Sequence, residues 1–151
     1  MSTSNQRVLR GLLAGVLAWV VPGAGHLLVG ARGRAAIFFV LMVLTVGLGL
    51  AFDGNLSVVD PRTPVLSRLQ VATNLAIGPV EPVVRTSLYG ALVYNPSGLS
   101  PSAAEREAMR RRRERAFATW SAYGTAYLLA AGLMNVLLVL DAWDIAIGRK
   151  E

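Results

Sequence analysis

The chain has 151 residues, of which 54% are hydrophobic and 16% are charged, with a formal net charge of +6. Its length fits about one domain, but an average soluble domain carries about 25% charged residues. This composition argues against intrinsic disorder and against a free soluble enzyme. The absence of cysteine excludes disulfides, thiolate catalysis and cysteine-ligated metals. We therefore expect an all-α integral membrane protein.

The first apolar stretch covers residues 11–31 and follows Arg7 and Arg10. Basic residues before an apolar run are typical of a signal peptide, but we expect this segment to be retained as a membrane helix. Pro22-Gly23 interrupts it, because proline removes a backbone hydrogen bond and glycine loosens the helix. The sequence therefore predicts a span kinked at this point, with a half-span that turns back as the alternative.

Two further stretches are long and apolar enough to cross a bilayer, which takes about 20 helical residues. Residues 35–52 contain no charged residue, and residues 119–140 are followed by Asp141. Together with the first stretch they predict three transmembrane helices in a bacterial cytoplasmic (inner) membrane. Residues 1–52 form the N-terminal transmembrane hairpin of this prediction.

The connection over residues 53–101 is rich in Pro, Gly, Ser and Asn, and we expect it to lie outside the membrane core. Thr63-Pro64 predicts a helix start, because proline is favoured at the first helical position. Apolar residues then recur at helical spacing, namely Val65, Leu66, Leu69, Ala72, Leu75 and Ala76. The pattern predicts an amphipathic helix that lies on the membrane surface or against a partner.

Residues 102–151 are predicted to form a basic helix that is continuous with the third span. Ser102 and Glu105 have capping-box spacing, and no helix breaker follows before Gly124. The exposed arginines of this helix are expected to bind anionic lipid headgroups or an acidic partner; they are Arg110, Arg111, Arg112, Arg113 and Arg115. Nucleic acid is not expected, because no aromatic platform or recognition motif accompanies them.

Three spans place the N-terminus and the long connection on one side of the membrane. Most basic residues lie on that side, so the positive-inside rule predicts a cytoplasmic N-terminus. Connections longer than about 60 residues can translocate despite their charge. The two short basic segments, at Arg32–Arg34 and at the C-terminus, favour the opposite orientation.

Charged residues near the ends of the spans predict an ion-pair cluster that joins the first hairpin to the third helix. Carboxylates in a membrane need partners, and span parity brings Asp141 and Asp144 to the same face as His26, Arg32 and Arg34. A proton or cation pathway is the alternative. Close helix packing is expected at small or polar positions, namely Pro22, Gly23, Gly25, Gly132 and Asn135.

The segment Pro22-Gly23-Ala24-Gly25-His26, with Arg32-Gly33-Arg34 after it, resembles the two-helix "TM-two" transmembrane domain family. The C-terminal stretch from Ala131 to Asp144, which contains Leu140-Asp141-Ala142-Trp143-Asp144, strengthens a similarity to small bacterial membrane proteins of unknown function. The two ends together make up about half of the chain. This resemblance implies a compact membrane fold and no known catalytic residues.

No phosphate loop, dinucleotide fingerprint, nucleophile elbow or His-Glu-x-x-His motif is present. A single histidine without neighbouring ligands predicts no metal site, and no cofactor is predicted, although bound lipid or pigment stays open. We expect a non-enzymatic accessory or scaffolding subunit of a larger membrane complex, for example a respiratory or photosynthetic one. The alternatives are a small homo-oligomeric transporter or channel, with Asn135, Asp141 and His26 on its path, and a lipid-modifying enzyme.

Overall fold

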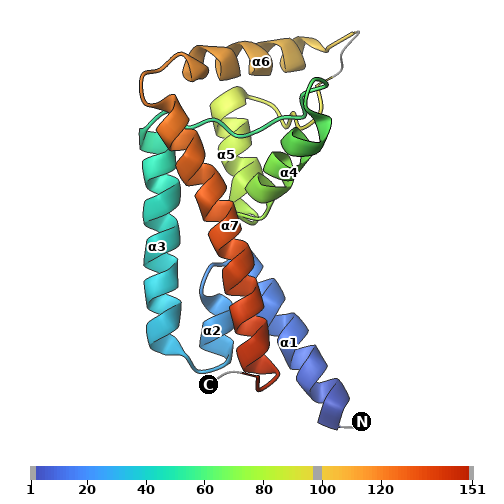
Figure 1. Ribbon diagram of the computed structural model, residues 1–151, viewed down its shortest axis with the longest axis vertical. Coiled ribbons are helices and arrows are strands. Elements are labelled where there is room, and N and C mark those ends of the chain that lie inside the picture. Colours follow the sequence, from blue (N-terminus) through green and yellow to red (C-terminus); the bar gives the residue numbers. More distant parts are fainter. Residues whose placement is uncertain (1–2, 97–99, 150–151) are drawn as a thin grey trace. The chain divides into compact units, whose positions relative to one another are not determined.

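The computed structural model describes residues 3–96 and 100–149, and this part of the chain contains seven helices and no strand (Figure 1). The all-helical prediction is confirmed. The chain forms two compact units, one from Met1–Leu44 with Leu133–Glu151 and one from Thr45–Gly132. We call these the terminal unit and the central unit. Two long helices contribute residues to both units.

Those two helices, α3 (Arg32–Ala51) and α7 (Ser121–Ala146), are long and apolar enough to cross a membrane. Their 20 and 26 residues correspond to about 30 Å and 39 Å of helix. Large apolar side chains point outward along both helices, including Ile37 (60% exposed) and Leu137 (65% exposed). The predicted second and third spans correspond to these helices.

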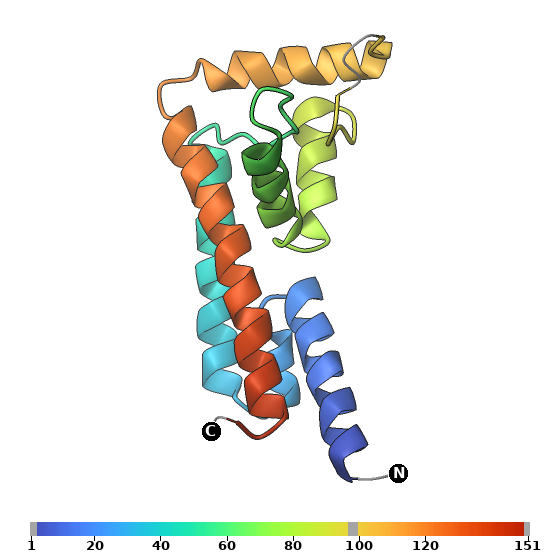
Figure 2. The ribbon, with the colours of Figure 1, turned by 45° about the vertical axis from the view of Figure 1, so that its right-hand side comes forward.

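In the terminal unit, α1 (Thr3–Val20) lies antiparallel to the second half of α7 (Figures 1 and 2). A side chain at Gly11 would meet Trp143 and Ile147, and one at Gly15 would meet Val139. These glycines therefore let the two helices approach closely. Small residues continue the contact, since Ala14, Ala18, Ala142 and Ala146 form the buried core of this unit.

The chain reverses direction after α1, because Gly23 adopts φ 89° and α2 (Ala24–Leu28) folds back against α1. A Cβ atom at Gly25 would lie 2.2 Å from the carbonyl oxygen of Ala14 and 2.9 Å from the Cβ of Ala142. The predicted break at Pro22-Gly23 is confirmed. Three spans are not confirmed: the first half of α1 carries polar and charged residues, and its apolar part ends where the chain turns back.

The central unit contains an irregular segment at residues 52–63, then α4 (Pro64–Leu75), α5 (Val80–Tyr89) and α6 (Ala103–Ala116). The predicted starts of α4 and α6 are confirmed, with Pro64 in the first turn and a complete capping box between Ser102 and Glu105. The core of this unit is Leu56, Tyr89, Val93, Ala108 and Leu128. In both views α6 lies across the start of α7 (Figure 2).

The prediction of one continuous helix from residue 103 into the third span is wrong. Helix α6 ends at Ala116, and short-range backbone bonds turn the chain before α7 begins at Ser121. No glycine or proline causes this break. Instead, Arg112 of α6 and Thr125 of α7 both bind the same irregular segment, and a straight helix would not bring both side chains to it.

Gly132 allows a close helix contact in the central unit, because a Cβ atom at this position would overlap the carbonyl oxygen of Thr73 on α4. We expect Gly132→Ala to push α4 away from α7 and to lower the free energy of unfolding by about 1–3 kcal/mol or more. Gly47→Ala is the matched control, because no atom lies within 4 Å of its added Cβ. Denaturation in mixed micelles measures the free energy of unfolding of both variants. Equal values for Gly132→Ala and Gly47→Ala would contradict this packing.

Candidate functional site

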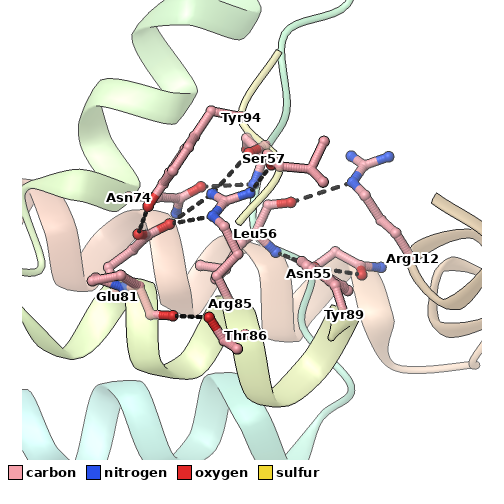
Figure 3. A network of polar contacts seen from close by, with 12 residues as sticks. Asn55, Leu56, Ser57, Asn74, Glu81, Arg85, Thr86, Tyr89, Tyr94 and Arg112 are labelled. Atoms are coloured by element: carbon pink, nitrogen blue, oxygen red, sulfur yellow. Dashed lines mark hydrogen bonds and ion pairs between the residues drawn. The ribbon is translucent and has the colours of Figure 1, made fainter. Parts of the chain in front are cut away.

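Arg85 is fully buried in the central unit and is the centre of its polar network (Figure 3). Its Nε donates to Glu81 Oε1 at 2.7 Å, and its Nη2 lies 2.6 Å from the same oxygen. Its two terminal nitrogens also donate to the carbonyl oxygens of Val93 (2.8 Å) and Ser57 (3.0 Å). The guanidinium is therefore paired with a carboxylate and joins two chain segments that have no regular secondary structure.

The partner carboxylate, Glu81, is 1% exposed and is held on both oxygens. While Oε1 accepts from Arg85, Oε2 accepts from the hydroxyl of Tyr94 at 2.9 Å. The ring of Tyr94 lies 4.3 Å from the Arg85 guanidinium carbon, which adds a cation–π contact. A buried ion pair is tolerated only when its remaining hydrogen-bonding groups are satisfied, and here both charged groups have several partners.

The backbone of the irregular segment is bonded by side chains from other elements. The N–H groups of Asn55, Leu56 and Ser57 donate in turn to Thr125 Oγ1 (3.0 Å), Tyr89 Oη (2.8 Å) and Asn74 Oδ1 (2.7 Å). The carbonyl oxygens of Leu56 and Ser57 accept from Arg112 and Arg85. These side chains replace the bonds that a helix would supply, so the N–H groups of residues 55–57 are paired although this part of the chain is buried.

Sequence reasoning missed this network, including Asn55, Asn74, Glu81, Arg85 and Tyr89. One signal was available: Glu81 and Arg85 have i, i+4 spacing inside an otherwise apolar stretch. Charged residues in such a stretch pair inside the protein. Asn55 and Asn74 carried no comparable signal, because both occur in segments whose composition is typical of surface loops or helix faces.

In the terminal unit, the predicted association of His26 with Asp141 is present. His26 is fully buried in α2, and its Nε2 lies 3.1 Å from Asp141 Oδ2 on α7. Because the carboxylate accepts, Nε2 carries the proton. The edge of the Phe38 ring packs against the imidazole at 4.9 Å. This pair ties the returning helix α2 to α7.

The other predicted charged residues lie near this pair in the same unit. Asp144 pairs with Arg149 at 3.8 Å. Asp141 and Asp144 also line an open, mainly apolar groove of about 430 Å³ with residues of α3 and α7. Arg32 and Arg34 lie exposed in the first turn of α3, and Arg32 borders a second groove beside Pro22 and Gly23.

Two predicted packing residues of α7 are buried in different units. Asn135 belongs to the terminal unit, where its Nδ2 lies 3.5 Å from the carbonyl oxygen of Trp19. Gly132 belongs to the central unit and contacts Thr73 as described above. Both positions therefore serve helix packing within their own units.

The five arginines predicted to bind a partner or lipid fall into two groups. Arg112 and Arg115 reach inward to the carbonyl oxygens of Leu56 (3.2 Å) and Gly54 (3.5 Å), and Arg115 also lies 3.5 Å from Asp53. Arg110, Arg111 and Arg113 are exposed. Arg110 and Arg113, together with Arg106, Met109 and Phe117, line a surface groove of about 440 Å³.

Ion pairs with two arginines of α6 favour the charged form of Glu107. Hydrogen bonds from Arg110 and Arg111 lower the pKa of Glu107 to about 2, and the same pairing raises the pKa of Arg110. Because the pKa of Glu107 in the folded chain lies below its unfolded value of 4.5, its ion pairs stabilise the fold above pH 4.5. This contribution is lost as the pH falls towards 2. These surface pairs therefore support α6 at neutral pH but add little energy each.

The buried polar side chains of both units contact the chain's own backbone or each other. Among residues 3–96 and 100–149, no group of three or more His, Asp or Glu side chains is arranged to hold a metal ion. Glu81 and His26, the two buried groups suited to proton transfer, are both engaged in pairs that hold helices together. The geometry supports a structural use of these residues.

Replacing Arg85 tests the network. Arg85→Met leaves the buried Glu81 carboxylate without its cation and frees two carbonyl oxygens, so we expect a loss of about 3–5 kcal/mol in unfolding free energy. Arg113→Met is the matched control, because this exposed arginine should change stability by less than about 0.5 kcal/mol. Denaturation in mixed micelles gives both values. If Arg85→Met had the same free energy of unfolding as the wild-type chain, the network would not support the fold.

Comparison with known proteins assigns the chain to a family. No curated protein and no solved structure matches the chain. The sequence model of a family of unknown function, DUF6677, matches residues 13–151 and so includes the central connection. The chain therefore belongs to the DUF6677 family.

Proposed function

We propose that this protein is a non-enzymatic, multi-pass subunit that packs against a larger complex in a bacterial cytoplasmic membrane. The observation that carries the proposal is the use of the buried polar groups: Glu81, Arg85 and His26 are bonded to one another, to backbone or to a neighbouring helix. The outward faces of α3 and α7 are apolar, and α6 presents a basic surface. A membrane partner supplies contacts for both kinds of surface.

Aromatic residues support a membrane boundary at one end of the spans. Phe52 directly follows α3, and its ring lies 6.3 Å from Trp120 and 6.0 Å from Tyr127 at the start of α7. Trp120 also packs 5.7 Å from Tyr123, and both are more than half exposed. Trp and Tyr are enriched where transmembrane helices meet the headgroups, so this cluster fits a membrane–water interface.

Two spans place both termini on one side of the membrane. Because α1 runs along α7 and α2 returns beside it, the start of α3 at Arg32 lies at the same end of the terminal unit as Arg7 and Arg149. These short basic segments count in the positive-inside rule, whereas a connection of more than about 60 residues counts little. We infer that both termini are cytoplasmic and that the connection between α3 and α7 begins and ends on the opposite side.

Cysteine labelling tests this topology, since the natural chain has no cysteine. We expect Gln6→Cys and Arg149→Cys to resist a membrane-impermeant maleimide in intact right-side-out membranes, while Ala104→Cys on α6 reacts. Both terminal variants should react after the membrane is permeabilised. Opposite reactivity of Gln6→Cys and Arg149→Cys would mean an odd number of crossings. Labelling of both termini, with Ala104→Cys protected, would reverse the orientation.

The groove of α6 is the surface that we assign to the partner. Its three arginines (Arg106, Arg110 and Arg113) outnumber its two glutamates (Glu105 and Glu114) and give it a net positive charge, while Met109 and Phe117 (89% exposed) give it apolar area. Arginine forms bidentate pairs with carboxylates, so an acidic partner segment with an apolar residue fits this groove.

Co-purification in mild detergent tests the partner. We expect a partner protein to co-purify with the wild-type chain at fixed stoichiometry. The double variant Arg106→Gln/Arg113→Gln should retain this partner about five- to tenfold more weakly. The reason is the loss of two interfacial charges, each of which contributes about 1 kcal/mol or less. Arg62→Gln/Arg68→Gln removes the same charge elsewhere and should retain the partner. A solitary monomer, or equal loss in both variants, would contradict the proposal.

A further inference from the structure

Helices α4 and α5 have an inverted distribution of polar and apolar residues. The apolar residues that define the predicted amphipathic face of α4 point outward, including Val65 (72% exposed) and Leu69 (61% exposed). The residues of α4 that point inward include Ser67 (3% exposed) and Asn74 (fully buried). Soluble proteins bury apolar faces, so this arrangement indicates a nonpolar environment outside the helix.

Helix α5 shows the same inversion. Glu81 and Arg85 face inward and pair with each other, whereas Val83 is 65% exposed and Val80 is 47% exposed. From residue 64 to residue 89, Arg68 is the one charged side chain that is exposed. It lies one turn after the start of α4, where a long arginine side chain can reach the headgroup region.

Two threonine hydroxyl groups of these helices are bonded to backbone carbonyl oxygens of the same helix. Thr73 Oγ1 donates to the carbonyl oxygen of Leu69 at 2.9 Å, and Thr86 Oγ1 donates to that of Pro82 at 2.8 Å. Bonds of this i to i−4 type satisfy threonine inside transmembrane helices. The outer surface of the hairpin is therefore compatible with hydrocarbon at these two positions.

Contacts within the central unit show how far the hairpin extends along α7. The irregular segment meets Ser121 and Thr125 near the aromatic cluster, whereas Thr73, near the end of α4, meets Gly132. Gly132 lies eleven positions after Ser121, which corresponds to about 17 Å along the axis of α7. This depth is about half of a hydrocarbon core of about 30 Å.

We propose that α4 and α5 form a re-entrant hairpin that enters the bilayer beside the first half of α7, with its outer face against lipid acyl chains. The proposal rests on the membrane location given under the proposed function. Non-helical backbone at membrane depth must be bonded within the protein. The turn between α4 and α5 meets this need, because the N–H groups of Ala76, Ile77 and Gly78 donate to the carbonyl oxygens of Ala72, Asn74 and Leu75. The hairpin turns inside the membrane and returns to the side on which α6 lies.

Fluorescence depth measurements test this inference. Single-cysteine variants at Val65, Leu75 and Val83 are labelled with bimane and reconstituted into vesicles of phosphatidylcholine and phosphatidylglycerol. Nitroxide lipids spin-labelled at the headgroup or on the acyl chain report depth, and iodide reports exposure to water. Leu137→Cys on α7 is the membrane control, and Ala104→Cys on α6 is the aqueous control.

We expect acyl-chain nitroxides to quench Leu75 and Val83 within about twofold of Leu137, and iodide to quench Ala104 at least fivefold more than Leu75. Leu75 should lie deeper than Val65, because α4 descends about 15 Å between them. Equal depths of Val65 and Leu75 would mean a helix lying on the surface and would overturn the inference. The inference would also be overturned if iodide quenched the labels at Leu75 and Val83 while acyl-chain nitroxides quenched the label at Leu137. Failure of Leu137 to meet lipid would instead overturn the membrane location itself.

Discussion

The fold of the central unit depends on how the backbone of residues 54–58 is bonded. This segment is buried but has no regular secondary structure, so each of its amides needs a partner from elsewhere. Side chains of four helices supply those partners: α4 with Asn74, α5 with Arg85 and Tyr89, α6 with Arg112, and α7 with Thr125. One short segment thereby fixes the relative positions of the helices around it.

This constraint explains why α6 is not a simple extension of α7. Arg112 must reach the Leu56 carbonyl oxygen, while Ser121 receives a hydrogen bond from the side chain of Asn55. Two helices that bind one segment from different directions require a turn between them. As a result, one face of α6 is used for the fold, and the face with Arg106 and Arg113 is available for a partner.

The helices of the terminal unit pack mainly through small residues, whereas those of the central unit are joined by polar side chains bonded to an irregular segment. Gly25 lets α2 return against Ala14 and Ala142, and the reversal at Gly23 requires a left-handed conformation that glycine adopts easily. The His26–Asp141 contact then joins α2 to α7 by one directional bond. Polar groups in both units thus serve to hold apolar helices together.

The sequence by itself determined the all-helical class, the two long apolar helices, the break at Pro22-Gly23 and the starts of α4 and α6. These features depend on local signals: apolar run length, proline and glycine geometry, and capping residues. Only the tertiary structure decided that α2 folds back, that α6 and α7 are separate, and that the apolar face of α4 points outward. Each of these depends on contacts between residues distant in sequence, such as Thr73 with Gly132 or Arg85 with Ser57, and no local pattern encodes such contacts.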